Sequence, residues 1–151
     1  MSRYEVPAWY MDWLWSLPLL FVTVLFHVFF LLLIRNKVVH FLEHGARHRQ
    51  LSLVFAMGIT VLLITVLHAG EATAWGVVYL WLGALPDAKT AMLYSLSAMT
   101  ASASIELDPH WKLMGAVESI NGVVLFGFTT AVLFSIVEHI SGITDRQRQG
   151  E

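Results

Sequence analysis

Hydroxyl groups recur at every second position in one short segment of the C-terminal half. The segment reads Thr100, Ala101, Ser102, Ala103 and Ser104. In an extended backbone alternate side chains point to the same side, so these hydroxyls and the neighbouring carbonyls could line one wall of a pore or cavity. The same residues also fit an ordinary polar loop at a helix end, and the segment alone leaves both interpretations open.

Two polar residues interrupt the last long apolar run of the chain. Glu118 and Asn121 are three positions apart, which puts them on one face of a helix. Ionisable groups at membrane depth are candidates for function, although a hydrogen bond between helices or exposure at the membrane surface would also explain them. In the same run Gly122 and Gly127 allow close packing or a bend, and Gly127 is the candidate gating hinge.

Histidines form a second group of candidate ligands. His40, His44 and His48 recur every four residues and could share one helical face, which suits a transition metal or a protonation switch. Spacing alone is weak evidence, and Gly45 interrupts the repeat. A solvated connector is therefore the favoured interpretation of this segment.

His27 and His68 lie in or near apolar runs, where two imidazoles could in principle ligate a haem. A polar pair between His68 and Glu71, three residues apart, is the simpler interpretation. The sequence has no cysteine, which excludes disulfides, thiolate catalysis and cysteine-based zinc or iron-sulfur sites. Paired catalytic carboxylates and a Ser-His pair at useful spacing are also missing, so we expect no enzyme, no metal site and no cofactor.

The elements that carry these residues are predicted from hydropathy. Mean hydropathy is +0.66 and only 13% of the residues are charged, so the chain is expected in a lipid bilayer. The basic residues are scattered and the formal net charge is -2, which predicts no nucleic-acid partner. Three runs are long enough to cross about 30 Å of hydrocarbon, namely residues 13–34, 51–70 and 113–137.

Two shorter apolar segments remain. If residues 72–85 continue the second helix, its length reaches about 50 Å, so that helix either projects from the bilayer or bends near Gly70. Residues 88–99 are too few to cross alone and are expected to form a re-entrant helix. The predicted fold is an all-α membrane protein with three transmembrane helices, a re-entrant helix and a loop.

The distribution of Lys and Arg predicts the orientation, because these residues accumulate in short cytoplasmic loops. A re-entrant segment places six of them inside and three outside, whereas a crossing at 88–105 gives five against four. The inside set is Arg35, Lys37, Arg47, Arg49, Arg146 and Arg148, and the outside set is Arg3, Lys89 and Lys112. We expect a multi-pass protein of the cell membrane with its N-terminus outside and its C-terminus in the cytoplasm.

A longer set of residues follows in a fixed order from His68 onward. It comprises Glu71, Trp75, Tyr79, residues 82–87, a short Ala/Leu/Tyr/Ser helix, residues 105–107, Pro109, Trp111, residues 112–115, Glu118, Asn121 and Gly122. In this order the chain resembles the pore module of small bacterial two-transmembrane potassium channels, a family also labelled two-pore-domain-like. The resemblance covers residues 51–140 and implies a bacterial inner-membrane protein.

The resemblance implies an arrangement for the whole pore. The second and third spans would be its outer and inner helices, residues 88–99 its pore helix, and four identical subunits would surround one axis. The chain then divides into residues 1–50, a transmembrane helix with its connector, residues 51–140, the potassium-channel-like pore domain, and residues 141–151, a cytoplasmic tail.

The selectivity filter is the point at which the chain departs from that family. Filters of the family read Thr-Val/Leu-Gly-Tyr-Gly-Asp, and their carbonyl oxygens replace the water around potassium. Residues 100–104 read Thr-Ala-Ser-Ala-Ser, and an alanine in a left-handed position costs roughly 1–2 kcal/mol relative to glycine. The filter-like loop therefore predicts weak or altered potassium selectivity.

Acidic residues follow the loop and predict a preference for cations. Glu106 and Asp108 would form a ring of carboxylates at the outer mouth, although they also fit solvated loop acids. Carried over from the resemblance, Glu118 and Asn121 would support the filter by bracing the pore helix. The expected function is a tetrameric pathway for monovalent cations, and the alternative is a non-conducting homologue that acts as a membrane scaffold or regulatory subunit.

Overall fold

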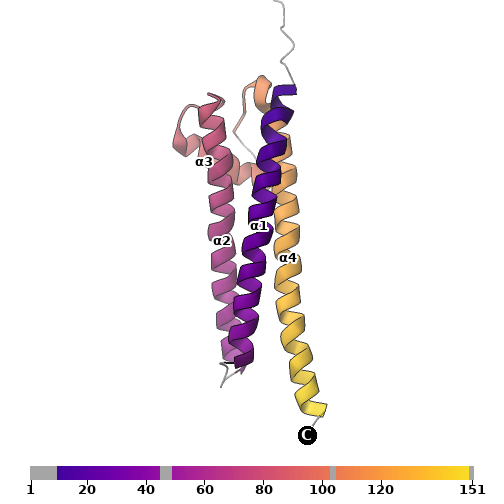
Figure 1. Ribbon diagram of the computed structural model, residues 1–151. Coiled ribbons are helices and arrows are strands. Elements are labelled where there is room, and N and C mark those ends of the chain that lie inside the picture. The colour runs from indigo at the N-terminus through magenta and orange to yellow at the C-terminus, as the bar shows by residue number, and fades with distance from the viewer. Residues whose placement is uncertain (1–9, 45–48, 103–104, 150–151) are drawn as a thin grey trace, which may run out of the picture. The chain divides into compact units, whose positions relative to one another are not determined.

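The computed structural model describes residues 10–44, 49–102 and 105–149 and is all-helical over that part of the chain (Figure 1). Its elements are α1 (Tyr10–His44), α2 (Arg49–Trp81), α3 (Ala88–Met99), the short 3-10 helix η1 (Pro109–Trp111) and α4 (Lys112–Gln149). Three of these helices, α1, α2 and α4, are long and apolar enough to cross a membrane. The predictions of an all-α fold and of three helices able to span a membrane are confirmed at this level.

The long helices extend beyond the apolar runs that predicted them. Residues 51–70 and 72–85 do not form separate segments, because α2 continues through Gly70 to Trp81. With 33 residues, α2 has a length of about 50 Å, as expected for the continuous alternative. Similarly, α4 continues past residue 137 to Gln149.

The chain forms two compact units, and each long helix contributes to both. Unit 1 contains residues 10–25 and 68–125, and unit 2 contains residues 26–67 and 126–149. The core of unit 1 gathers aromatic and aliphatic residues from α2, α3 and α4 around Trp75, Tyr79 and Tyr94. The core of unit 2 is smaller and joins Leu42, Ala56 and Ile136, one residue from each long helix.

Hydroxyl side chains within the long helices bond to the backbone of the preceding turn. The Thr60 hydroxyl donates to the Ala56 carbonyl at 2.7 Å, and the Thr130 hydroxyl donates to the Phe126 carbonyl at 2.9 Å. A hydroxyl without a partner would be costly in hydrocarbon, and this local bond satisfies it inside its own helix. These threonines therefore require no functional explanation.

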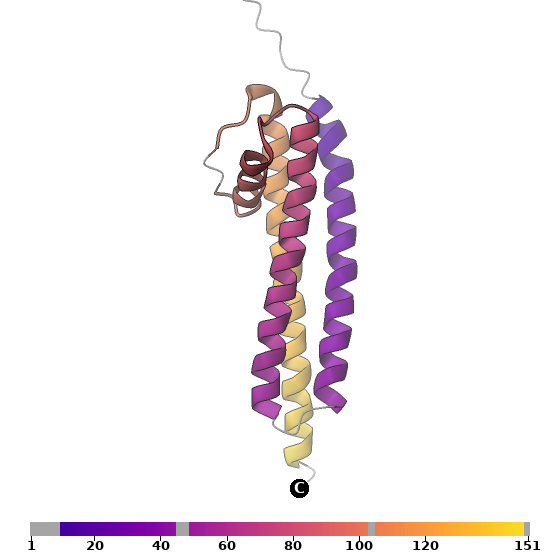
Figure 2. The same cartoon turned by 90° about the vertical axis from the view of Figure 1, so that its left-hand side faces the viewer.

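Helix α3 occupies residues 88–99, as the sequence predicts, and both of its ends are capped. Asp87 is the N-cap, and its carboxylate accepts hydrogen bonds from the backbone N–H groups of Lys89 and Thr90, both at 3.0 Å. Hydrogen bonds from Thr90 lower the pKa of the Asp87 carboxyl from its ordinary value. Within unit 1, α3 lies beside the C-terminal end of α2 and the N-terminal end of α4 (Figure 2).

Candidate functional site

One face of α3 is buried against α2 and α4, and the opposite face is exposed. Ala91, Tyr94 and Ala98 pack into the core of unit 1. Leu93 and Leu96 are 50% and 40% exposed, although both are large apolar side chains. Helix α3, with 12 residues, is thus packed against the rest of unit 1 through one face only. Its other side is free for contact with lipid or with another molecule.

Glu118 connects the three helices around this core. It is fully buried on α4, and its carboxylate accepts a hydrogen bond from the Tyr79 hydroxyl of α2 at 2.8 Å. The Tyr79 ring packs edge-on against Tyr94 of α3, with ring centroids 5.2 Å apart. The Ser95 hydroxyl of α3 is also buried beside the Glu118 carboxylate. Glu118 therefore lies directly behind α3.

Asn121 points to a different neighbour. It is fully buried, and its side-chain amide donates to the Thr23 hydroxyl of α1 at 3.2 Å. Although Glu118 and Asn121 are only three residues apart, one contacts α2 and the other contacts α1. The interpretation of both as hydrogen bonds between helices fits this geometry.

Asp12 makes a contact that the sequence analysis did not predict. Its side chain is buried in unit 1 and accepts hydrogen bonds from the backbone N–H groups of Leu113 and Met114. These groups lie in the first turn of α4, where backbone N–H groups have no partner within the helix. Asp12 of α1 therefore caps a different helix, and its negative charge is favourable at that end. An acid close to the start of an apolar run was the available signal.

The filter-like segment begins with a helix cap rather than an extended strand. The Ala101 N–H donates to the Ala98 carbonyl at 2.8 Å and the Ser102 N–H donates to the Ser97 carbonyl at 2.8 Å, which is the Schellman pattern of a helix C-terminus. Ala101 has a φ of 53°, in the left-handed region. Of the two interpretations of this segment, residues 100–102 do not adopt the extended row of alternating hydroxyls, because the backbone N–H groups of Ala101 and Ser102 complete the last turn of α3. Ala103 and Ser104 lie outside the described residues.

The hydroxyls of this cap are also bonded locally. The Thr100 hydroxyl donates to the Ser97 carbonyl at 3.0 Å and lies 2.7 Å from the Ser102 hydroxyl. Thr100, Ala101 and Ser102 are all exposed. The C-terminal end of α3 therefore presents two hydroxyls outward, in a conformation fixed by the helix itself.

The two caps of α2 and α3 provide a matched test of the alanine at position 101. Gly83 occupies the equivalent left-handed position after α2, with a φ of 69°, and a Cβ there would meet no atom within 4 Å. Because a left-handed backbone penalises a side chain at both positions, we expect Ala101→Gly to stabilise the protein by about 1 kcal/mol and Gly83→Ala to destabilise it by a similar amount. Thermal unfolding of both variants in detergent measures this. Shifts of the same sign would contradict the left-handed assignment.

Glu106 and Asp108 are exposed, and Leu107 between them is buried in the core of unit 1. Asp108 is the N-cap of η1, where its carboxylate accepts from the His110 N–H at 2.9 Å. The buried Leu107 anchors the segment, so both acids point away from the core. The predicted outer-mouth residues are thus placed on the surface, as either interpretation requires.

The described histidines contact polar groups of their own or a neighbouring helix. His68 and Glu71 approach to 3.3 Å within α2, as the polar-pair interpretation expects. In unit 2 the His27 ring and the Thr129 hydroxyl are 3.1 Å apart. His40 is exposed, whereas the side chains of His44 and His48 lie outside the described part of the chain.

The glycines of α4 differ in their surroundings. A Cβ on Gly122 would lie 2.1 Å from the Met99 carbonyl oxygen, so the last residue of α3 packs directly on this glycine. A Cβ on Gly127 would meet nothing within 4 Å, and α4 is continuous through it. Of these two glycines, Gly122 is therefore the one at which close packing requires the absence of a side chain.

Comparison of the chain with family models, with curated proteins and with solved structures finds no significant match.

Proposed function

We propose that the protein is a homotetrameric pathway for monovalent cations, with weak discrimination between potassium and sodium. The observation that carries the proposal is α3, a helix of 12 residues between two helices long enough to span a membrane. A helix of this length cannot cross a bilayer, and at bilayer depth its ends require a protein or aqueous environment. One copy supplies one such helix, so a closed ring of copies is needed to enclose a path.

The electrostatics of the exposed α3 end favour cations. A helix C-terminus carries a partial negative charge of about half an elementary charge. The exposed hydroxyls of Thr100 and Ser102 adjoin this end, and Glu106 and Asp108 add two carboxylates per copy. Four copies around an axis would concentrate cations at the mouth while leaving them partly hydrated.

A non-conducting tetrameric scaffold is the second candidate, and one observation favours it. The hydroxyls of Thr100 and Ser102 bond to each other, and the Thr100 hydroxyl also bonds to the end of α3. Carbonyl-based selectivity needs a continuous extended backbone. The turn at Ala101 interrupts such a backbone at the start of the loop.

The decisive experiment is the reversal potential of the purified protein in a bilayer with opposed potassium and sodium solutions. We expect a value near zero, because a hydroxyl-lined opening leaves both ions hydrated. The double variant Glu106→Gln with Asp108→Asn should lower the preference for cations over anions, most clearly at low salt, where screening is weakest. Asp87→Asn, which removes an exposed acid at the opposite end of α3, is the matched control.

Three outcomes would change this proposal. A reversal potential close to the potassium equilibrium value would contradict weak selectivity. A stable tetramer without flux would favour the scaffold. A monomer or dimer, measured by mass in nanodiscs, would exclude both tetrameric functions. Accessibility labelling of a cysteine at position 108, in this cysteine-free chain, tests the proposed outside location of Asp108.

A further inference from the structure

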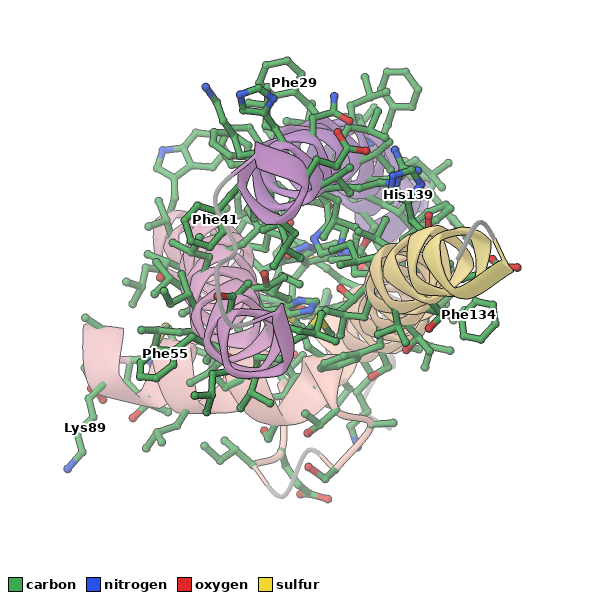
Figure 3. The ribbon with its side chains drawn as sticks, turned by 90° about the horizontal axis from the view of Figure 1, so that it is seen from below. Phe29, Phe41, Phe55, Lys89, Phe134 and His139 are labelled. Carbon is green, nitrogen blue, oxygen red and sulfur yellow. The ribbon has the colours of Figure 1, made fainter. Side chains whose placement is uncertain are left out.

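A polar pocket of about 340 Å³ lies between α1 and α4 in unit 2. Its lining contains both a cationic and an anionic side chain and comprises Arg35, Ser135, Glu138, His139 and Gly142. Figure 3 shows His139 on the side of α4 that faces α1, where its ring approaches the Glu43 carboxylate to 2.8 Å. The pocket therefore opens beside a contact that holds the two helices together.

The two charges of the pocket are not neutralised by each other. The Arg35 Nε donates to the Ser135 hydroxyl at 3.0 Å, which fixes the guanidinium on α4 and leaves its terminal nitrogens available. Within the described residues, no ion pair joins Arg35 to Glu138, and Glu138 has no hydrogen-bond partner. A pocket with a separated guanidinium and carboxylate suits a ligand that carries an anion and a cation a short distance apart.

The sequence places this pocket at the level of lipid headgroups. The first apolar span ends at residue 34, immediately before Arg35, and the third ends at residue 137, immediately before Glu138. The polar region of a bilayer begins where such runs end. Leu32 and Phe134 lie about one helical turn before Arg35 and Glu138, inside the apolar spans. They are 50% and 67% exposed, and Phe134 points away from the other helices in Figure 3.

We infer that this pocket binds the headgroup of phosphatidylethanolamine. The Arg35 guanidinium and the Ser135 hydroxyl donate to the phosphate, and the Glu138 carboxylate accepts from the ammonium group. The acyl chains extend from the headgroup towards the apolar spans, where Leu32 and Phe134 are exposed on their own helices. This site is separate from the α3 region and does not depend on whether the protein conducts ions.

The arrangement also predicts which lipids bind less well. Phosphatidylglycerol offers the phosphate but no ammonium group for Glu138. Phosphatidylcholine carries a quaternary ammonium that has no N–H to donate. Phosphatidylglycerol therefore gives the Glu138 carboxylate no opposite charge, and phosphatidylcholine gives it no hydrogen-bond donor.

The test is a titration of delipidated, full-length protein with each of the three lipids in detergent, followed by native mass spectrometry. We expect phosphatidylethanolamine to bind about tenfold more tightly than either of the others. Arg35→Gln should weaken all three, and Arg35→Lys should restore part of the loss, because a lysine keeps the charge without the fork. Glu138→Gln should remove the preference over phosphatidylglycerol. Lys37→Gln, a cation on α1 that lines a different groove, is the matched control.

Equal binding of the three lipids by the wild-type protein would overturn the inference, as would an Arg35→Gln variant that binds like Lys37→Gln. Soluble phosphoethanolamine separates the two possible sources of this chemistry. If it binds as tightly as the lipid, the pocket serves a free solute and the lipid assignment is wrong. Binding of the lipid alone supports the membrane assignment.

Discussion

Replacement of Gly122 by alanine is expected to lower the free energy of unfolding by about 3 kcal/mol. A Cβ at this position would lie 2.1 Å from the carbonyl oxygen of Met99 and 2.6 Å from its Cα. Backbone atoms cannot move away by a change of rotamer, so the C-terminal end of α3 must shift as a whole. Thermal or denaturant unfolding in detergent measures the loss, and ion flux measures whether the shift of α3 reaches the proposed pathway.

Two other glycines of α4 are controls for this variant. Gly127→Ala introduces a Cβ that meets nothing within 4 Å, so we expect a gain of about 0.5–1 kcal/mol from helix propensity. Gly115→Ala brings the Cβ to 2.0 Å from the Tyr94 hydroxyl, which is the end of a side chain, and its cost should fall between the two. Equal stability of Gly122→Ala and Gly127→Ala would contradict the packing of α3 on Gly122.

The sequence predicted the helices better than it predicted their ends. A charged side chain in the hydrocarbon core costs free energy, so charge-free runs mark the part of each helix that lies in hydrocarbon. The hydrogen bonds of a helix do not stop where the hydrocarbon stops. For this reason α2 reaches Trp81 and α4 reaches Gln149. The short α3 was predicted with correct bounds because Asp87 and the break after Met99 delimit it.

The candidate site was predicted only in part, because its contacts join different helices. Glu118 and Asn121 stood out as polar residues in an apolar run, and both are fully buried. Their partners Tyr79 and Thr23 lie on other helices, and the period of one helix does not reveal which neighbour a side chain meets. The cap at Ala101 was missed for another reason, since glycine is the usual signal for a left-handed residue.

The hydrogen bond between Tyr79 and Glu118 provides the second large expected effect. Tyr79→Phe removes the donor to one oxygen of the fully buried Glu118 carboxylate. A buried acceptor without a partner costs about 1–3 kcal/mol, so Tyr79→Phe should destabilise the protein by an amount in this range. Tyr10→Phe, which changes a 58% exposed tyrosine, should have almost no effect. Thermal unfolding of the purified variants provides both values.

A double-variant cycle then separates this bond from general packing at the core of unit 1. Glu118→Gln keeps an oxygen that can accept from Tyr79, so it should cost less than Glu118→Leu, which removes the carboxylate acceptor of the Tyr79 hydroxyl. Tyr79→Phe combined with Glu118→Leu removes both members and should be less destabilising than the sum of the single changes by about 1–2 kcal/mol. Strict additivity would show that the two groups do not interact. Packing alone would then hold Glu118 behind α3. The hydrogen bond between α2 and α4 would no longer be part of the proposed support of α3.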